Sequence, residues 1–519
     1  MKNINCLTFL LCFFGALFFQ NCAQPSVKEE AEEKKPNIVF IYLDDLGYGD
    51  VSAYKSGTLQ TPDMDVLANG GLRFTNGYAS SATCTPSRYA LLTGTYPWRN
   101  QNAKILPGTA PLIIDTAQMT LPKMLKSQGY ETAVIGKWHL GLGTGFVDWN
   151  QEIAPNPNHV GFDYSHILAA TQDRVPTVYI ENGRVVNLDL NDPISVDYDK
   201  NFEGEPTAIS NPEMLTMKWH HGHNNSIVNG IPRIGYMKGG QNAKWSDIDM
   251  ADHFLEKGKA YIKEKAKSES PFFLFFPMQQ PHVPRTPHPR FEGKSGMGPR
   301  GDALLEADWV IGELYKTLEE TGLLENTLIV FSSDNGPVLN DGYYDDAVEK
   351  VGDHTPAGPF RGGKYSLFEA GTRVPFVTYW KGEIQPGVSD ALVTQIDLLA
   401  SLAALVGSTE SGPDSENLLE AFLGKSQEGR EAVILEASTK TALRAGDWAM
   451  IPPYPGPAVQ NQVNIELGNS PEYQLYNLKD DPGQRNNLAS SNPEKLEEMK
   501  KLYQEIRGGE GKIEQVELK

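Results

Sequence analysis

The chain has 519 residues and a formal net charge of −20 at neutral pH, from 66 acidic and 46 basic residues. This excess of acidic residues argues against an extended basic face, so we do not expect the protein to bind nucleic acid. An anionic ligand can still be bound in a local basic pocket. The length allows for about three domains, although large α/β enzymes often have fewer.

The N-terminal segment has the pattern of an export signal. Lys2 gives it a positive start, and residues 7–19 are an apolar stretch too short to span a bilayer in the mature protein. Cys22, followed by an acidic run, is typical of a bacterial lipoprotein, although Phe19-Gln20-Asn21 departs from the small residues usual before such a cysteine. We expect an exported bacterial protein, either periplasmic or held at the outer membrane or cell surface by lipid on Cys22. A soluble protein with a cleaved signal is the alternative.

Cysteine usage supports this interpretation. The four cysteines are Cys6, Cys12, Cys22 and Cys84. The first two would be lost with the signal, and a lipid on Cys22 would leave Cys84 as the only thiol. A disulfide framework is then impossible, and we infer that Cys84 is kept for its chemistry. Residues 23–35, which have almost no apolar content, would form a flexible tether.

Short apolar runs alternate with helical patterns through the rest of the chain. Buried strands are expected at 37–43, 132–135, 271–276, 327–331 and 374–379. Helices are expected between them at 120–128, 248–266 and 301–321. This alternation predicts an α/β fold with a large mixed, mostly parallel sheet sandwiched by helices. In such sheets the ligand site lies beyond the carboxyl ends of the strands.

Polar residues follow two of these strands directly. Asp44 and Asp45 come after the first, and Asp334 and Asn335 come after the run 327–331. Three carboxylates and an amide at neighbouring strand ends would repel one another unless a cation lay between them. Oxygen ligands favour Ca²⁺ or Mg²⁺ over zinc. The alternative is that both are ordinary strand-end turns.

The most informative stretch begins at Cys84, with the letters C-T-P-S-R, an apolar run and a Thr-Gly stop. Pro86 suits the first turn of a helix, so Cys84 would lie at a helix N-terminus, whose unpaired N–H groups favour an anion. Arg88 lies one turn later on the same face and could point at whatever Cys84 holds. The pattern predicts a receptor for sulfate or phosphate, against the alternative of a capped helix with a half-buried cysteine. Three residues separate Cys84 from Arg88, whereas cysteine phosphatases need five.

Four further basic residues follow buried strands or glycines. Lys137 and His139 alternate along an extended segment and therefore share one face. His282 lies between prolines after the strand at 271–276, which fixes its position. Lys364 follows Arg361-Gly-Gly, where the glycines allow close approach of the backbone. We interpret Arg361 as structural support.

The segment 82–94 resembles the modification motif of the formylglycine-dependent (type I) sulfatases of the alkaline-phosphatase superfamily, and 129–141 resembles their second signature. The resemblance covers nearly all of 36–510. It implies that Cys84 is converted to formylglycine (3-oxoalanine) before export, by a formylglycine-generating enzyme or an anaerobic sulfatase-maturating enzyme. It also implies Ca²⁺ as the ion, with the ligands Asp44, Asp45, modified Cys84, Asp334 and Asn335.

The resemblance implies roles for the remaining residues as well. Hydrated formylglycine would attack sulfur after Asp334 takes its proton. Arg88, Lys137 and Lys364 would neutralise the negative charge on the sulfate oxygens. His282 would protonate the leaving sugar, and His139 would deprotonate the second hydroxyl and expel sulfate.

The stretch 143–241 is polar and interrupts the alternation, so we interpret it as an insertion that recognises substrate. It contains Asp173-Arg174, a pair that can hydrogen-bond vicinal sugar hydroxyls, and the run 227–231. It also contains three histidines that lack an evident fourth zinc ligand, His220, His221 and His223. These pieces resemble bacterial polysaccharide and glycosaminoglycan 6-O-sulfatases acting on galactose or N-acetylgalactosamine. That resemblance implies substrate binding by Asp173, Arg174, His221 and His223. The Asp–Arg pair would recognise the axial O4 of the galacto sugar.

Three rival functions remain at this point: a broad-specificity arylsulfatase, a phosphoesterase on the same scaffold, and a non-catalytic glycan-binding lipoprotein. The arylsulfatase shares every core residue, and only the insertion argues against it. A phosphoesterase would normally carry Ser or Thr in place of Cys84. A binding protein would not need Lys137, His139, His282 and Lys364.

The C-terminal part has a different composition. We expect a catalytic domain over 36–407 that closes with an amphipathic helix at 393–406, then a linker over 408–428. Residues 429–519 are expected to form a small α+β subdomain, an antiparallel sheet with one helix. Its strands are expected at 432–436, 441–444, 448–451 and 472–477, and its helix at 493–506.

Overall fold

The computed structural model describes residues 34–55 and 57–508. The expected signal over 1–22, the lipid site Cys22 and nearly all of the tether lie outside the described residues. Within these residues, 36–55 and 57–508 form one compact unit. Within the described ranges, every helix is too short or too polar to cross a membrane.

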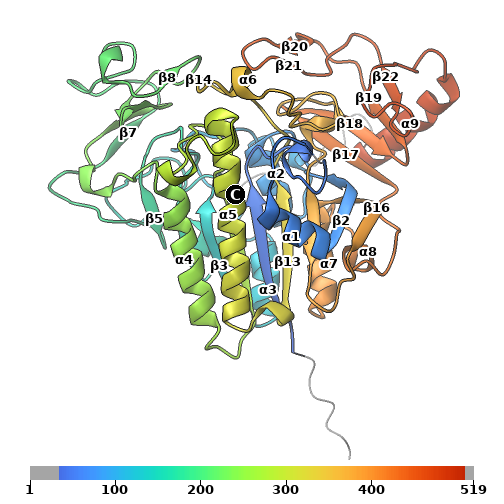
Figure 1. The fold of residues 1–519 in the computed structure, drawn as a ribbon, viewed down its shortest axis with the longest axis horizontal. Coiled ribbons are helices and arrows are strands. Elements are labelled where there is room, and N and C mark those ends of the chain that lie inside the picture. Colours follow the sequence, from blue (N-terminus) through green and yellow to red (C-terminus); the bar gives the residue numbers. More distant parts are fainter. Residues whose placement is uncertain (1–33, 56, 509–519) are drawn as a thin grey trace, which may run out of the picture. The chain divides into compact units, whose positions relative to one another are not determined.

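A ten-stranded mixed sheet forms the centre of the molecule, in the order β16-β2-β15-β13-β1-β12-β3-β4-β5-β6 (Figure 1). Its strands are β1 Asn37–Leu43, β2 Leu72–Tyr78, β3 Glu131–Lys137, β4 Tyr164–Leu168, β5 Tyr179–Glu181, β6 Arg184–Val185, β12 Phe272–Pro277, β13 Thr327–Ser333, β15 Phe376–Tyr379 and β16 Gly387–Thr394. The strands from β13 to β4 are parallel, whereas β15, β5 and β6 run antiparallel to their neighbours. The predicted α/β fold is confirmed, including all five strands expected for the sheet.

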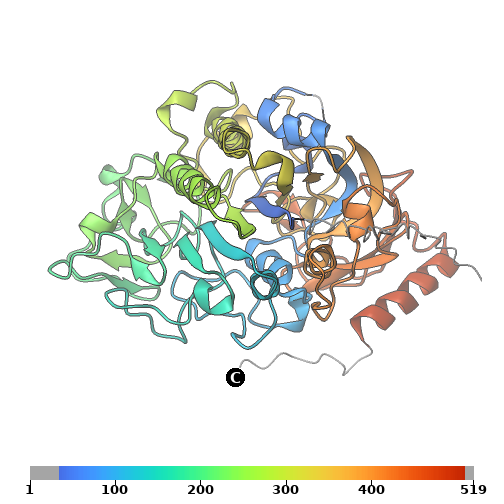
Figure 2. The same cartoon turned by 90° about the horizontal axis from the view of Figure 1, so that it is seen from below.

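Helices cover both faces of this sheet (Figure 2). One face carries α2 Cys84–Thr93, α3 Leu121–Ser127 and α7 Leu398–Leu405, and the other carries α1 Pro62–Gly70, α4 Met250–Lys265 and α5 Gly298–Glu320. Alternate residues of β1 enter the two cores, with Phe40 on one side and Ile41 on the other. Because both faces are covered, β1 is an unbroken apolar run, and this is why it is recognisable in the sequence.

The end of the catalytic region differs from the expectation. The helix expected at 393–406 begins only at Leu398, because Val393 and Thr394 complete β16 beside β2. The segment 408–428, interpreted as a linker, contains α8 Leu419–Phe422, and the Phe422 ring stacks on Phe376 at 5.6 Å. This segment therefore contributes to the core.

The stretch 143–241 has two parts. Its first part supplies β4, β5 and β6, which extend the central sheet, so it is not wholly an insertion. Its second part forms three small ribbons in which β7 pairs with β11, β9 with β10, and β8 with β14. These strands are β7 Ser195–Asp197, β8 Lys218–Trp219, β9 Ile227–Val228, β10 Ile231–Pro232, β11 Tyr236–Lys238 and β14 Tyr343–Tyr344.

The C-terminal region forms the predicted small antiparallel sheet, in the order β17-β18-β19-β22, with one long helix packed on it. Its elements are β17 Ala432–Ala437, β18 Lys440–Ala445, β19 Trp448–Ile451, β22 Gln474–Asn477 and α9 Pro493–Arg507. A hairpin of β20 Val459–Gln460 and β21 Ile465–Glu466 lies between β19 and β22 in the chain, and α6 Ala347–Lys350 follows β14.

The edge of the small sheet holds the chain just before α2. Ser81 forms a bridge with Glu436, the Ala82 amide donates to the Glu436 carbonyl (2.7 Å), and the Glu436 amide donates to the Ser80 carbonyl (3.1 Å). The position of Cys84 therefore depends on a strand located some 350 residues later in the chain.

The Glu436 side chain makes the stability of this junction depend on pH. Within the described part of the chain its Oε2 is buried without a hydrogen-bond partner, and burial raises the pKa of Glu436 from 4.5 to about 8. The folded state thus keeps a proton that the unfolded chain releases, so this group's contribution to the free energy of unfolding falls as pH rises from about 4.5 through 8. Glu436→Gln should flatten that part of the stability–pH profile, measured as urea midpoints between pH 5 and 9. Exposed Glu472→Gln is the control, and unchanged slopes in Glu436→Gln would contradict the prediction.

Candidate active site

The carboxyl ends of β1 and β13 bring the predicted acidic residues together. The two strands pair in parallel with Leu43 opposite Ser333, so Asp44-Asp45 and Asp334-Asn335 leave the sheet side by side. Asn335 Nδ2 donates to Asp45 Oδ1 (2.7 Å), and the Asp45 amide donates to Asp334 Oδ1 (3.3 Å). All four side chains are buried.

Cys84 completes this cluster as the first residue of α2, at the helix N-terminus that the sequence predicted. Its Sγ lies 3.4 Å from Asp44 Oδ1. Asp44, Asp45, Cys84 and Asp334 each offer a ligand atom, and these atoms all lie within 4.8 Å of one another.

The donor set fits a hard divalent cation. The carboxamide oxygen Asn335 Oδ1 is buried beside the carboxylates and has no hydrogen-bond partner among the described residues, so it is free to act as a ligand. Burial, and then the Asp334 charge, raise the pKa of Asp44 to about 6. Burial also raises the pKa of Asp45 to about 6. Crowded carboxylates of this kind are stabilised by a cation with oxygen ligands.

Each carboxylate of the cluster also has a buried basic partner. Lys137 contacts Asp44, Lys364 Nζ lies 2.9 Å from Asp45 Oδ2, and Arg88 Nη2 lies 2.7 Å from Asp334 Oδ2. The sequence suggested that Arg88 points at the group held by Cys84. Its guanidinium instead contacts Asp334 and the Lys137 carbonyl, because a buried Arg must satisfy its donors.

The Cys84 thiol is a poor nucleophile in this setting. Burial, and then the Asp44 charge, raise the pKa of Cys84 well above its usual range. Attack by a sulfur nucleophile requires a thiolate. The arrangement therefore does not support catalysis by an unmodified cysteine.

Two histidines beside Cys84 are fixed by backbone carbonyls. His139 Nε2 lies 3.0 Å from the Leu106 carbonyl, which can only accept, so Nε2 carries the proton and the buried Nδ1 has a free lone pair. His282 Nδ1 lies 2.6 Å from the Val283 carbonyl, which leaves its Nε2 at 3.9 Å from Asp45 Oδ2. Burial lowers the pKa of both, with Lys137 adding to the effect at His139 and Lys364 at His282. Both imidazoles are therefore neutral at pH 7.

A pocket of about 190 Å³ opens onto Cys84. Eight residues singled out in the sequence line it, namely Cys84, His139, Asp173, Arg174, His221, His223, His282 and Lys364. Arg88, Lys137 and the strand-end residues Asp44, Asp45, Asp334 and Asn335 are buried and are not part of its lining. His220 lies in the lining of a different pocket, so the three histidines of the insertion do not converge on one point.

The insertion contributes an ion network to this pocket. Arg174 Nη1 lies 3.0 Å from Asp173 Oδ1, and His223 Nε2 lies 2.8 Å from Asp173 Oδ2. Burial opposes ionisation, but Arg174 and His223 nevertheless hold the pKa of Asp173 well below its usual range. A charged carboxylate and a guanidinium therefore line the same pocket as Cys84.

Sequence reasoning missed two polar residues of the pocket. Asp341 accepts from Lys364 Nζ (2.8 Å) and from the Tyr365 hydroxyl (3.0 Å), and both Asp341 and Tyr365 line the pocket. Asp341 precedes a glycine in what reads as an ordinary turn, and Tyr365 has a positive φ of 73° that no local pattern indicates. Only the position of Tyr365 beside Lys364 could have drawn attention to it. Arg361 pairs with Glu466 away from the pocket (2.5 Å), as expected of structural support.

Comparison with known proteins gives a consistent picture. The family model described as sulfatase matches residues 36–408. An N-acetylgalactosamine-6-O-sulfatase of Bacteroides thetaiotaomicron is 48% identical over 98% of this chain and 100% of its own length. Human arylsulfatase A is 31% identical over 91% of this chain and 88% of its own.

Two solved structures share the fold. One, described with the metabolism of multiple glycosaminoglycans by Bacteroides thetaiotaomicron, has a TM-score of 0.90 and 49% identity, and the match covers 91% of this chain and 99% of that one. The other, a sulfatase from Pseudoalteromonas sp., has a TM-score of 0.69 and 25% identity, with 93% and 92% covered.

The strand-end cluster yields a test for cation binding. Adding Ca²⁺ to chelator-treated protein should raise its Tm, because a ligand at about 100 times its Kd stabilises the folded state by about 2.7 kcal/mol. Asp45→Asn should reduce this shift strongly, whereas Asp199→Asn, an exposed acidic site elsewhere, should retain it. The measurement is a thermal melt over a calcium titration. Equal shifts in the two variants would rule out this cluster as the binding site.

Proposed function

The chain belongs to the sulfatase family and is a sulfuric ester hydrolase, and we propose that it removes the 6-O-sulfate of galactose or N-acetylgalactosamine in a sulfated polysaccharide. The observation that carries the sugar assignment is the network of Asp173, Arg174 and His223 opposite Cys84. The name of the 48% identical relative supports the same substrate class.

We propose that residue 84 acts as 3-oxoalanine, formed by a formylglycine-generating enzyme or an anaerobic sulfatase-maturating enzyme. The raised pKa of the Cys84 thiol supports this, because an unmodified thiol would be inert. The modified residue supplies the attacking oxygen, and Ca²⁺ held by Asp44, Asp45, Asp334 and Asn335 would make that oxygen more acidic.

Three cations can neutralise the sulfate. Lys364 lines the pocket, while Arg88 and Lys137 are buried beside it and hold the Asp334 and Asp44 carboxylates in place. Positioned charges of this kind are often the largest contribution to lowering a reaction barrier. We propose that all three act on the negative charge that develops on the sulfate oxygens.

The two histidines differ in the nitrogen they present. His139 has its Nδ1 lone pair free and a lowered pKa, which suits a base that removes a hydroxyl proton at position 84. His282 uses Nδ1 for the Val283 carbonyl and presents Nε2. Its lowered pKa would rise when an anionic sulfate enters the pocket, since a nearby negative charge favours imidazolium. We propose His282 as the acid that protonates the leaving sugar oxygen.

Sugar recognition is proposed to rest on Asp173 and Arg174, with His221 and His223 at their side. The Asp173 carboxylate accepts from sugar hydroxyls and the Arg174 guanidinium donates to them. The contact between His223 Nε2 and Asp173 Oδ2 limits the orientation of the Asp173 carboxylate.

Export and domain organisation also remain proposals. We propose a signal over 1–22 with lipid on Cys22, periplasmic or surface location, and a catalytic domain over 36–407 followed by a C-terminal subdomain. The bacterial relative supports this setting.

Loss of the residue 84 nucleophile should abolish turnover. Cys84→Ala should lower sulfate release by at least about a thousandfold, because a catalytic group acting as a unit with its neighbours cannot be replaced by them. Released sulfate is measured by ion chromatography, after the mass of the residue 84 peptide has been shown to correspond to the aldehyde in the wild type. Multiple turnovers by Cys84→Ala would refute the mechanism.

The Asp173–Arg174 network should confer selectivity among sugars. We expect sulfate release from 6-O-sulfated galactose and N-acetylgalactosamine, but little from 6-O-sulfated N-acetylglucosamine or 4-O-sulfated N-acetylgalactosamine. Asp173→Asn should lower kcat/KM on the galacto substrates by about 10- to 100-fold, the effect of losing a hydrogen bond to a charged group. Sulfate release at similar rates from all of these sugars would contradict the proposed specificity. Hydrolysis of aryl sulfates at the same rate would favour an arylsulfatase, and action on phosphate esters alone would favour a phosphoesterase.

A further inference from the structure

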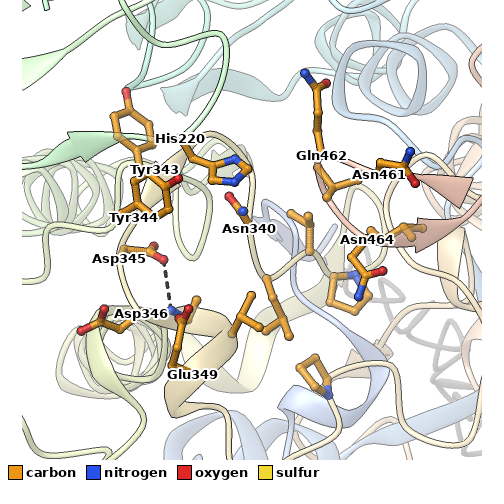
Figure 3. A pocket seen from close by; sticks show the side chains of 18 of the residues that line it. His220, Asn340, Tyr343, Tyr344, Asp345, Asp346, Glu349, Asn461, Gln462 and Asn464 are labelled. Atoms are coloured by element: carbon orange, nitrogen blue, oxygen red, sulfur yellow. Dashed lines mark hydrogen bonds between the residues drawn. The ribbon is translucent and has the colours of Figure 1, made fainter.

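A second and larger pocket of about 440 Å³ lies next to the candidate active site (Figure 3). Its lining comes mainly from three parts of the chain: His220 of the insertion, the stretch 337–349 after β13, and residues 461–465 of the C-terminal hairpin. Pro356, Ala357 and Gly362 complete it. In Figure 3, Tyr343, Tyr344 and Asp345 stand on the left, Asn461, Gln462 and Asn464 on the right, and His220 and Asn340 between them. Its volume lies within the range of about 300–1,000 Å³ that is usual for ligand sites.

The two pockets share a wall. Neighbouring residues of the chain line opposite sides of it, with His220 beside His221 and Asn340 beside Asp341. This wall is fixed by a hydrogen bond from the His220 amide to the Gly342 carbonyl (2.7 Å). The two pockets are therefore adjacent in the structure.

The two pockets differ in the charged residues that line them. The Cys84 pocket contains the cations Lys364 and Arg174 beside the carboxylates of Asp341 and Asp173, whereas no Lys or Arg is found among the described residues that line the larger pocket. The acidic residues in its lining are Asp345, Asp346 and Glu349. Asp345 is paired with Arg285 (2.8 Å) and Asp346 with Lys350 (2.9 Å). Glu349 is exposed and has no ion-pair partner among the described residues. A second anionic group would be repelled here.

The remaining lining suits an uncharged sugar. Tyr344 is 61% exposed, with its ring held against His220 at 4.8 Å, and it offers an aromatic surface for the apolar face of a pyranose. Asn461 and Asn464 make no side-chain hydrogen bond within the described part of the chain, so their amides are available to sugar hydroxyls. Val338, Val463 and Ile465 form an apolar cluster beside them.

We propose that this pocket is a subsite for an uncharged sugar linked to the sulfated one. The inference rests on the proposed function and narrows its substrate class. The preferred glycan is one in which a 6-O-sulfated galacto sugar is joined to a neutral hexose or N-acetylhexosamine rather than to a uronic acid. The C-terminal hairpin then takes part in substrate binding.

The first test compares three substrates that share a 6-O-sulfated galactose: the monosaccharide, its disaccharide with N-acetylglucosamine, and its disaccharide with glucuronic acid. For the wild type we expect kcat/KM on the neutral disaccharide to exceed that on the monosaccharide by about tenfold. Tyr344→Ala should remove this advantage and leave the monosaccharide rate unchanged, whereas Tyr344→Phe should retain it. A neutral disaccharide that is no better than the monosaccharide in the wild type would overturn the proposal.

A second comparison tests the charge argument. The wild type should hydrolyse the glucuronic acid disaccharide more slowly than the neutral one. Added salt should reduce this difference in rate because it screens exposed charges. Glu349→Lys should increase the rate on the glucuronic acid disaccharide severalfold, with Glu349→Gln in between. Preference for the uronic acid substrate in the wild type would contradict the assignment.

Failure of the proposed function can be told apart from failure of the subsite. If aldehyde-bearing wild type releases sulfate from none of the three substrates, the galacto-6-sulfatase proposal fails. The subsite is then tested directly by titrating unsulfated galactosyl-N-acetylglucosamine against wild type and Tyr344→Ala in a calorimeter or by ligand-observed NMR. Binding that is lost in Tyr344→Ala would uphold the subsite, and equal or absent binding would overturn it.

Discussion

Repulsion among three buried carboxylates at the ends of β1 and β13 is the constraint around which this site is built. Asp44, Asp45 and Asp334 lie too close together to remain charged without compensation, and burial already raises the pKa of Asp44 and Asp45. Three basic side chains from different elements, Arg88, Lys137 and Lys364, provide part of that compensation. The carboxylates thus position the cations that we propose act on sulfate, so that metal binding and anion binding would depend on the same ion pairs.

This arrangement explains why distant parts of the chain are needed. The strand ends supply the acids, and the helix that begins at Cys84 supplies the nucleophilic position and Arg88. The small C-terminal sheet holds the preceding residues through Glu436, whose backbone bonds with Ser80 and Ala82 fix the start of that helix. Truncation within the C-terminal region would therefore disturb the position of Cys84 itself.

The two adjacent pockets differ in the charged residues that line them, and we propose that they bind different sugars of one glycan. The small pocket at Cys84 combines cations with the Asp173–Arg174 pair and suits one sulfated sugar. The larger pocket presents Tyr344, free amides and carboxylates and suits an uncharged neighbour. In a protein with a net charge of −20, the small pocket is unusual in presenting Lys364 and Arg174, and the acidic surroundings help to limit which anionic glycans approach it.

The sequence by itself determined the α/β class, the central strands and most of the candidate site. Strands such as 37–43 are buried on both faces and must be continuously apolar, and the acids that follow them must then lie at one edge of the sheet. Local patterns also indicated the helix start at Cys84 and the pairing of Asp173 with Arg174. They could not indicate that Val393 joins a strand, that Arg88 is held by Asp334, or that Asp341 lies beside Lys364. Those facts, and the larger pocket lined mainly by His220, 337–349 and 461–465, depend on contacts between residues far apart in the chain, which only the tertiary structure decides.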